Sequence, residues 1–339
     1  MGKRVLVTGG SGHLGNFVCS QLIGKGYEVF SFDQTPPPPN SLNQIAGVPF
    51  IKGDLLDLGE LMRAIAYSKA EYILHLAAIT GPSELRDPYS GDMPPQFRAF
   101  AASQRMPEDT CFKVNTLGTW YVLDAARRLG VKNVVLSSSY YATGIGQRPD
   151  GSGYTPPKLP VEEDDPVDSP MTSYDMSKYF NEIEGAGFSR AYGMNVIALR
   201  YMGVFYPDND FARKMYKFGV DAEARAQDKG LMIGDCGQYV DARDIADIME
   251  LCIGKIGKPP LKPFEVFFCS TDTMWKEDSA TAVAKRWPQF AEMAKNLIGH
   301  EGVMTTRKAE KLLGFKSHYS WRDGKDGYTP PSPPPPPSF

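Results

Sequence analysis

The sequence lacks the cysteine pattern of a zinc-binding or disulfide-rich protein. Its five cysteines are an odd number, they lie far apart, and no Cys-x-x-Cys pair occurs in the 339 residues. Structural zinc sites and disulfide frameworks normally show closely spaced or even-numbered cysteines. We therefore expect free thiols in a reducing compartment and no metal site.

An excess of charge of one sign is also missing. The chain has 37 Lys and Arg against 40 Asp and Glu, a net charge of -3. Nothing in this balance attracts a nucleic acid or an anionic membrane. No apolar run reaches the roughly 18 residues of a membrane span, and apolar residues 5–7 follow Met-Gly-Lys-Arg where a signal peptide would lie. We expect a cytoplasmic protein without nucleic-acid or membrane partners.

Proline, in contrast, is abundant. The chain has 28 prolines in 339 residues, a content of about 8%, whereas the usual content is about 5%. Many of them lie in residues 36–39, in two long connections over residues 80–107 and 143–170, and in the tail 329–339. With 42% hydrophobic and 12% aromatic residues the chain can still form a packed globule. We expect stiff loops that shape a pocket, and a disordered tail.

Strand-like and helix-like segments alternate along the first two hundred residues. The predicted strands cover residues 5–8, 28–33, 50–52, 72–76, 133–137 and 196–200, and the predicted helices cover 14–25, 55–69, 108–129 and 173–192. This alternation predicts an α/β fold with a doubly wound parallel sheet of the Rossmann type. We expect one domain over residues 1–200, a smaller C-terminal substrate-binding part over 201–328 with a strand at 264–268, and the tail.

A glycine-rich segment joins the first strand to the first helix. It contains Gly9, Gly10, Gly12, His13, Leu14 and Gly15. Glycines at this spacing let the backbone approach a pyrophosphate, whose charge the helix N-terminus stabilises. Asp33 follows Gly15 by eighteen residues, at the end of the second strand. A carboxylate there accepts hydrogen bonds from ribose hydroxyls and repels a 2′-phosphate, so the predicted cofactor is NAD rather than NADP.

A second motif consists of Tyr174 and Lys178, which are four residues apart in the predicted helix 173–192. Residues at this spacing share one face of a helix. A phenol with a pKa of about 10 is a poor base at neutral pH, and a nearby ammonium group favours the phenolate. The serines at 137–139 end the fifth predicted strand. We expect Ser137 and Ser138 to bond backbone groups there.

Taken in order, these motifs resemble the extended short-chain dehydrogenase/reductase family, which includes sugar-nucleotide epimerases and dehydratases. The resemblance covers residues 3–320 and implies that Ser139 holds the reacting oxygen and that the long helices 108–129 and 173–192 form a homodimer. The positions that it assigns to the cofactor or its surroundings are Asp54, Leu55, Leu76, Ala77, Ala78 and Asn115. Singly, Asp54 could equally cap the following helix, and His75 is typical of a buried residue rather than a ligand.

The resemblance implies hydride transfer at a secondary alcohol. Tyr174 would accept the hydroxyl proton, Lys178 would stabilise the phenolate and hold the nicotinamide ribose, and NAD would accept the hydride. The dehydratase branch has an acidic residue close after the serine, whereas Tyr140 and Tyr141 follow here. We therefore expect an NAD-dependent oxidoreductase acting on a sugar, a sugar acid or a similar polyol.

The substrate is less closely defined. Related epimerases carry an Asn and an Arg against the substrate diphosphate where this chain has Gly203 and Gly237-Gln238. The serine pair before a Gly, the Pro207-Asp208-Asn209-Asp210 turn and Arg213, six residues after Pro207, locally resemble uronate dehydrogenases. This resemblance implies that Thr80 and Arg213 contact the substrate, with Arg213 on a carboxylate; a solvated helix charge is the alternative for Arg213. Tyr140 and Tyr141 stand at substrate positions where that group has Asn and His. An epimerase that retains NAD is the alternative function. A non-catalytic NAD-binding regulator is a third, and it would not need Ser139, Tyr174 and Lys178.

Overall fold

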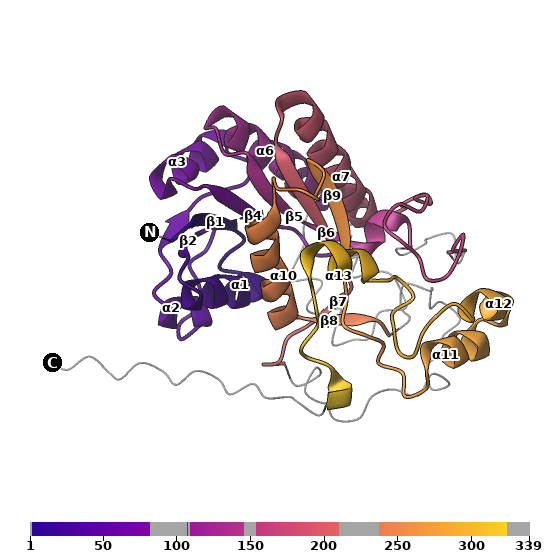
Figure 1. Cartoon of the computed structure of the whole chain (residues 1–339). Helices are drawn as coiled ribbons and strands as arrows, with labels where there is room; N and C mark the ends of the chain where they lie inside the picture. The colour runs from indigo at the N-terminus through magenta and orange to yellow at the C-terminus, as the bar shows by residue number, and fades with distance from the viewer. Residues whose placement is uncertain (1, 82–106, 108, 146–153, 210–236, 324–339) are drawn as a thin grey trace.

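The computed structural model describes residues 2–81, 107, 109–145, 154–209 and 237–323. At its centre lies a seven-stranded sheet in which every neighbouring pair is parallel, in the order β3-β2-β1-β4-β5-β6-β9 (Figure 1). The strands are β1 (Arg4–Thr8), β2 (Glu28–Asp33), β3 (Phe50–Lys52), β4 (Tyr72–His75), β5 (Asn133–Ser139), β6 (Asn195–Tyr201) and β9 (Phe264–Cys269). The prediction of a doubly wound parallel sheet is confirmed.

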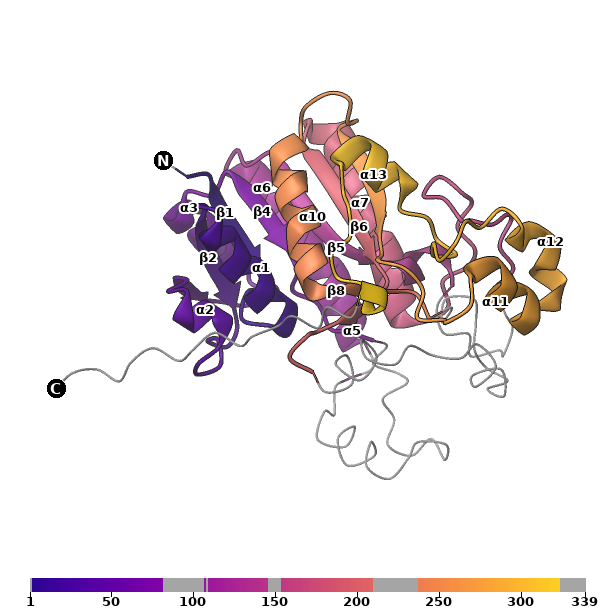
Figure 2. The same ribbon diagram turned by 60° about the horizontal axis from the view of Figure 1, so that its bottom comes forward.

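Helices cover both faces of this sheet. On one face lie α1 (His13–Gly24), α2 (Leu42–Ile45), α10 (Ala242–Lys255) and α13 (Arg307–Leu313), and on the other lie α3 (Leu58–Ser68), α6 (Gly118–Arg128) and α7 (Ser173–Tyr192) (Figures 1 and 2). The continuous apolar run in β1 shows why both faces need cover. Val5 and Val7 belong to the core on the α1 side, and Leu6 belongs to the core on the α3 side, because successive side chains of a strand point to opposite faces.

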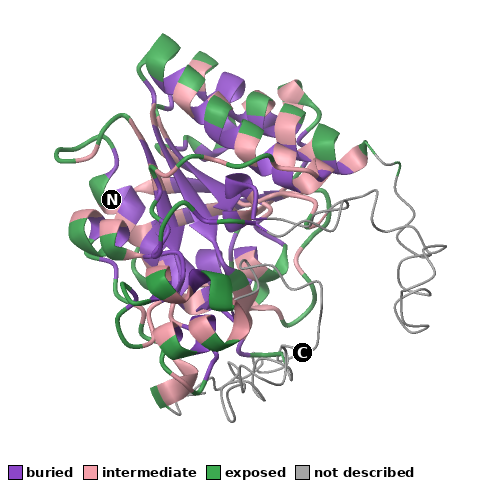
Figure 3. Ribbon diagram, turned by 90° about the vertical axis from the view of Figure 1, so that its right-hand side faces the viewer, coloured by how far each residue is buried: buried purple, intermediate pink, exposed green. Residues whose placement is uncertain are grey.

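The strand order reverses beside β1. The chain builds β1, β2 and β3 outward and then returns to place β4 on the other side of β1, with Thr8 paired to His75. At such a point the connections leaving the two strands run in opposite directions, and a crevice opens at their carboxyl ends. Figure 3 shows the strands as a buried layer between helices whose outer faces are exposed.

The C-terminal part completes the sheet and extends beyond it. Its strand β9 pairs with β6, so the sheet continues past the expected boundary at residue 200. Strands β7 (Gly203–Phe205) and β8 (Tyr239–Asp241) form a separate parallel pair. Helices α11 (Ser279–Arg286) and α12 (Ala291–Ala294) enclose a further apolar cluster around Trp275, which includes Tyr154, Leu159 and Val161 from the second long connection.

Most predicted elements lie within a few residues of the observed ones. The helix at 173–192 and the strands at 28–33 and 50–52 have the predicted bounds. The single helix predicted over 108–129 is wrong in detail, because α5 (Thr110–Phe112) and α6 are joined by a π-helical turn, Lys113–Leu117. Strand β5 runs on to Ser139. Within the described part of the chain, no helix combines the length and the apolar character needed to span a bilayer.

Candidate active site

The glycine-rich loop brings the backbone of β1, the N-terminus of α1 and the end of β4 into direct contact. A Cβ atom at Gly15 would overlap the Gly9 carbonyl oxygen and lie 2.6 Å from the Gly10 Cα, and one at Gly9 would lie 2.6 Å from the Ala77 nitrogen. Gly9 also has a φ of +71°, in the region that favours glycine. Gly12 provides no side chain to cap α1. The first N–H groups of the helix are therefore available to an anion in front of them.

One cavity of about 720 Å³ joins this loop to the predicted catalytic residues. Its volume lies within the ~300–1,000 Å³ typical of small-molecule and cofactor sites. Most residues predicted to contact the cofactor line it, namely Gly9, Gly12, His13, Leu14, Gly15, Asp33, Asp54, Leu55, Leu76, Ala77, Ala78, Tyr174 and Lys178. Gly10 and Asn115 are not among the lining residues. The crevice at the strand-order reversal is thus a single pocket that contains both motifs.

The two acidic residues predicted for the adenosine half are held by backbone groups. Asp33 accepts hydrogen bonds from the backbone N–H groups of Ser11, at 3.2 Å, and Gln34, at 2.8 Å. Asp54 accepts one from Leu56 at 2.9 Å. The alternative that Asp54 caps the next helix is wrong, because Asp57 is the N-cap of α3. Both carboxylates are thereby fixed at the wall of the cavity.

Behind the cavity, a buried chain of hydrogen bonds ties β1 and β4 to α7. His75 bonds to Thr8 through Nδ1 at 2.6 Å and to Thr119 through Nε2 at 2.9 Å. Thr119 donates to the Asn115 carbonyl, and the Asn115 amide donates to the Ser177 hydroxyl of α7. Burial lowers the pKa of His75 to about 3, so its ring is neutral. His75 and Asn115 therefore support the site from behind.

Ser139, Tyr174 and Lys178 line the cavity together. Lys178 donates from Nζ to the Ser137 carbonyl at 2.8 Å, and its Nζ lies 5.6 Å from the centre of the Tyr174 ring. Burial raises the pKa of Tyr174 well above its usual value, while a hydrogen bond with Ser139 acts in the opposite direction. Burial lowers the pKa of Lys178 to about 8. Both shifts favour the neutral forms, as expected for groups removed from water.

The same face of α7 carries a third contact to the end of β5. Glu182, four residues after Lys178, accepts a hydrogen bond of 2.6 Å from Ser138 and binds Arg200 of β6 through two contacts of 2.9 and 2.8 Å. The side chains of Arg200 and Glu182 are only 4% and 6% exposed. The sequence analysis did not single out Glu182, although its spacing continues that of Tyr174 and Lys178.

The serines before Ser139 differ from the expectation that they bond backbone groups. The Ser138 hydroxyl donates to Glu182, and the Ser137 hydroxyl lies 3.3 Å from that of Tyr201. Both partners are side chains of neighbouring elements. The backbone groups of β5 are already occupied in the sheet, where Ser137 and Ser138 pair with Leu199 and Arg200, so the hydroxyls are free to hold side chains.

The residues predicted for substrate binding are distributed more widely. Thr80 lines the cavity, but Tyr140 and Tyr141 are not among its lining residues. Tyr140 belongs to the apolar cluster of the C-terminal part, and the Tyr141 ring stands edge-on to Tyr174 at 6.0 Å. Arg213 lies outside the described residues. The cavity also has lining residues that the sequence analysis missed, Met202, Val204 and Tyr206, because only the tertiary structure brings the segment after β6 to this place.

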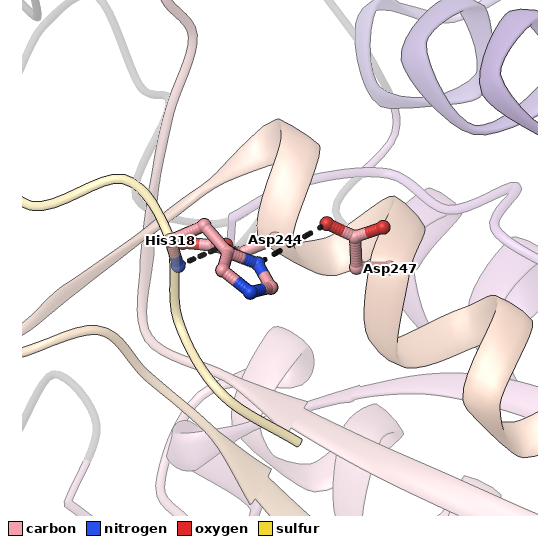
Figure 4. Close-up of side chains that lie close together, drawn as sticks. All are labelled: Asp244, Asp247 and His318. Atoms are coloured by element: carbon pink, nitrogen blue, oxygen red, sulfur yellow. Dashed lines mark hydrogen bonds and ion pairs between the residues drawn. The ribbon is translucent and has the colours of Figure 1, made fainter. Parts of the chain in front are cut away.

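A cluster of possible metal ligands lies elsewhere, at the N-terminal end of α10. Asp244, Asp247 and His318 each have a ligand atom within 4.8 Å of the others (Figure 4). Asp244 is fully buried and accepts hydrogen bonds from the Ser317 hydroxyl at 2.7 Å and the His318 N–H at 2.8 Å. These contacts fasten the segment after α13 to α10, so we assign Asp244 a structural role.

The fold and the cavity together define a Rossmann-type protein of the short-chain dehydrogenase/reductase class. The comparison with family models agrees, since residues 5–88 and 99–261 match the model of the NAD dependent epimerase/dehydratase family. The match covers well over half of the chain. The protein belongs to this family of NAD-dependent enzymes.

Individual relatives are more distant. A putative UDP-glucose 4-epimerase from Methanocaldococcus jannaschii is 29% identical over 205 residues, which is 59% of this chain and 56% of that protein. The chain thus matches little more than half of this relative. An uncharacterized protein from the same organism is 28% identical over 95% of this chain and 94% of its own length. The UDP-glucose 4-epimerase of Mycolicibacterium smegmatis is 28% identical over 75% of this chain and 74% of its own.

Solved structures share the fold at lower identity. The UDP-glucose 4-epimerase of Bifidobacterium longum, in complex with NAD+ and UDP, has a TM-score of 0.63 and 21% identity over 95% of this chain and 96% of that one. The enzyme of Thermotoga maritima with UDP-glucose has a TM-score of 0.61 and 21% identity, with coverage of 95% and 96%. The local resemblance to uronate dehydrogenases stays a prediction.

The buried pair between Glu182 and Arg200 generates a prediction about stability. Replacing Glu182 with Gln removes the carboxylate that hydrogen-bonds the buried guanidinium of Arg200, and we expect the free energy of unfolding to fall by about 3–5 kcal/mol. Denaturant titration followed by circular dichroism measures this. The control is Glu292→Gln in the exposed pair with Lys295, where the glutamate is 85% exposed and a change below about 1 kcal/mol is expected. Equal effects of the two substitutions would contradict a special role for the buried pair.

Proposed function

We propose that the cavity binds NAD and that the protein transfers hydride at a secondary hydroxyl group of a sugar. The residues present fit this cofactor. The uncapped N-terminus of α1 suits a pyrophosphate, and the carboxylate of Asp33 suits the ribose hydroxyls of a dinucleotide without a 2′-phosphate. The observation that carries the proposal is that Ser139, Tyr174 and Lys178 line the same cavity as the glycine-rich loop.

In this mechanism the chain supplies orientation and a proton acceptor. Ser139 holds the substrate oxygen, and Tyr174 removes its proton while the carbon–hydrogen bond breaks. NAD, when bound, provides the hydride acceptor. Lys178, anchored on the Ser137 carbonyl, brings a positive charge toward the phenol. That charge opposes the effect of burial, which keeps Tyr174 protonated in the free site.

For the net reaction we propose epimerisation of a nucleotide sugar. The enzyme would oxidise a carbinol carbon to a ketone and then return the hydride to the opposite face, so that NAD is regenerated and no redox partner is consumed. The curated relatives and solved structures named as UDP-glucose 4-epimerases support this choice. The sequence analysis placed net oxidation first, with epimerisation as the alternative, and the comparisons favour that alternative.

Net oxidation of a sugar or sugar acid is the second candidate, and one observation favours it. The Gln238 amide points into the protein, where it donates to Ser270 at 2.9 Å and to the Met304 carbonyl at 2.6 Å. Gly203 and Gly237 have no side chains. These three described positions therefore provide no cation for a substrate diphosphate, which leaves a smaller substrate such as a uronate open.

One assay separates the two reactions. We expect purified protein to interconvert UDP-sugar epimers without net NADH formation. Chromatography measures the epimers, and absorbance at 340 nm measures NADH. Removing the general base in Tyr174→Phe should lower the rate roughly 10²- to 10⁴-fold, whereas Tyr67→Phe, an exposed residue of α3, should not change it.

Stoichiometric NADH from uronates or aldoses, with no epimer formed, would establish the second candidate instead. If neither reaction occurs with any sugar while NAD binding persists, the protein is a regulator. An unchanged rate in Tyr174→Phe would exclude the assigned base.

The pKa of Lys178 predicts a pH dependence. With a value of about 8, the ammonium is present below pH 8 and is lost above it, together with its support for the Tyr174 phenolate. We expect kcat/KM to decline above about pH 8. In Lys178→Arg the guanidinium stays charged, because its pKa exceeds about 12, so this decline should disappear although the absolute rate falls. Lys132→Arg, at an exposed site, is the control, and an identical decline in Lys178→Arg would contradict the assignment.

We also propose that the protein is a homodimer. Large apolar side chains are exposed on the neighbouring helices α5, α6 and α7, among them Phe112, Trp120, Phe180 and Ile183. The rings of Phe112 and Phe180 meet edge-to-face at 5.7 Å, so the exposed side chains of α5 and α7 adjoin one another. Contiguous exposed apolar surface of this kind marks interaction sites, and a two-fold axis would cover the same patch on both copies.

Sedimentation analysis tests the dimer. We expect the wild type to sediment at twice the monomer mass and the double variant Trp120→Glu/Ile183→Glu to sediment as a monomer, because burying two carboxylates in the interface is costly. Tyr67→Glu on α3 introduces a charge at a residue that is 70% exposed and whose ring stands against Phe30 of β2, and it should remain a dimer. A monomeric wild type would overturn the proposal.

A further inference from the structure

The segment after β7 reaches back to the glycine-rich loop. The ring of Tyr206 stacks on the ring of His13 with centroids 3.8 Å apart and planes only 9° from parallel. His13 Nε2 lies 2.9 Å from both carboxylate oxygens of Asp208. The sequence analysis assigned no role to Tyr206 or to Asp208. Tyr206 and Asp208, almost two hundred positions after His13, thus make two specific contacts to its imidazole.

A buried ring supports this contact from within the protein. Phe17 lies one turn after His13 on α1 and is 5% exposed. Its ring centroid is 6.0 Å from that of His13 and 6.2 Å from that of Tyr206. The side chains of His13 and Asp208, in contrast, are 47% and 38% exposed. The three rings therefore form a packed unit whose polar side faces solvent.

The stacked pair joins two walls of the cavity. His13 and Tyr206 both line it, His13 as the first residue of α1 and Tyr206 just after β7. The N-terminus of α1 is where the pyrophosphate of the proposed cofactor would lie. The stack therefore connects these two walls at this edge of the cavity.

We propose that His13, Tyr206 and Asp208 form a clasp beside the pyrophosphate position and that this clasp slows the release of the cofactor. The clasp rests on the proposed function, because it requires a dinucleotide in the cavity. It also matches the epimerase reaction, in which the same cofactor must stay through oxidation and reduction. Asp208 contributes by holding the imidazole of His13. The same contact keeps the Asp208 carboxylate bound to a partner near an anionic ligand.

The test measures the dissociation rate of the reduced cofactor directly. Full-length protein loaded with NADH is mixed with excess NAD+, and the loss of bound NADH fluorescence gives the rate constant without any substrate. We expect Tyr206→Leu and His13→Ala each to increase it about three- to tenfold, the range that loss of an aromatic pair implies. The double variant should be no faster than the faster single variant, since either substitution opens the same clasp.

Two further variants complete the design. Asp208→Ala removes an exposed partner of His13 while leaving the three packed rings in place, and it should also increase the rate. Tyr67→Leu is the matched control, because Tyr67 is an exposed tyrosine whose ring stands edge-on to Phe30 at 6.2 Å outside the cavity, and it should leave the rate unchanged.

The possible failures can be told apart. If the wild type binds NADH but Tyr206→Leu and Asp208→Ala release it within twofold of the wild-type rate, the clasp is wrong and the proposed function stands. Fully additive effects in the double variant would likewise overturn a single clasp. If circular dichroism shows folded wild type that binds neither NADH nor NAD+, both the clasp and the proposed function fail.

Discussion

The reversal of strand order at β1 and β4 is the constraint on which the site depends. A parallel sheet that is built outward from β1 in both directions must leave a crevice at the carboxyl ends of these two strands. The glycine-rich loop, Asp33 and the segment Leu76–Ala78 all follow strands that end at this edge. Close contact at Gly9 and Gly15 then leaves no room for side chains between the loop and its neighbours. The position of the cavity therefore follows from the topology and from Gly9 and Gly15.

The orientation of the predicted catalytic residues depends on a second feature, the docking of α7 against the end of β5. Lys178 binds the Ser137 carbonyl, Glu182 binds the Ser138 hydroxyl, and Ser139 and Tyr174 meet at the cavity. These contacts join three successive serines at the end of β5 to three residues on one face of α7. Arg200 of β6 closes the arrangement from behind, because its guanidinium fits both oxygens of Glu182. A rigid scaffold of this kind suits a proton transfer that tolerates little displacement.

Electrostatics in the free cavity oppose the reaction that the residues would perform. Burial holds Tyr174 protonated and lowers the pKa of Lys178. A positively charged nicotinamide and a substrate oxygen in the cavity would change this balance, since opposite charge and hydrogen bonding favour the phenolate. In the free cavity, burial thus opposes the charged form of both groups, more strongly for Tyr174 than for Lys178.

Much of this molecule could be predicted from local sequence patterns. The alternation of apolar segments indicated the order of strands and helices up to residue 200, and the spacing of the glycines and of Tyr174 and Lys178 indicated the two motifs, because strand and helix periods act over a few residues. Tertiary structure decided which distant segments meet. It brought Arg200 to Glu182, Tyr206 and Asp208 to His13, and β9 to β6. Such contacts depend on packing between elements far apart in the chain, which no local period encodes.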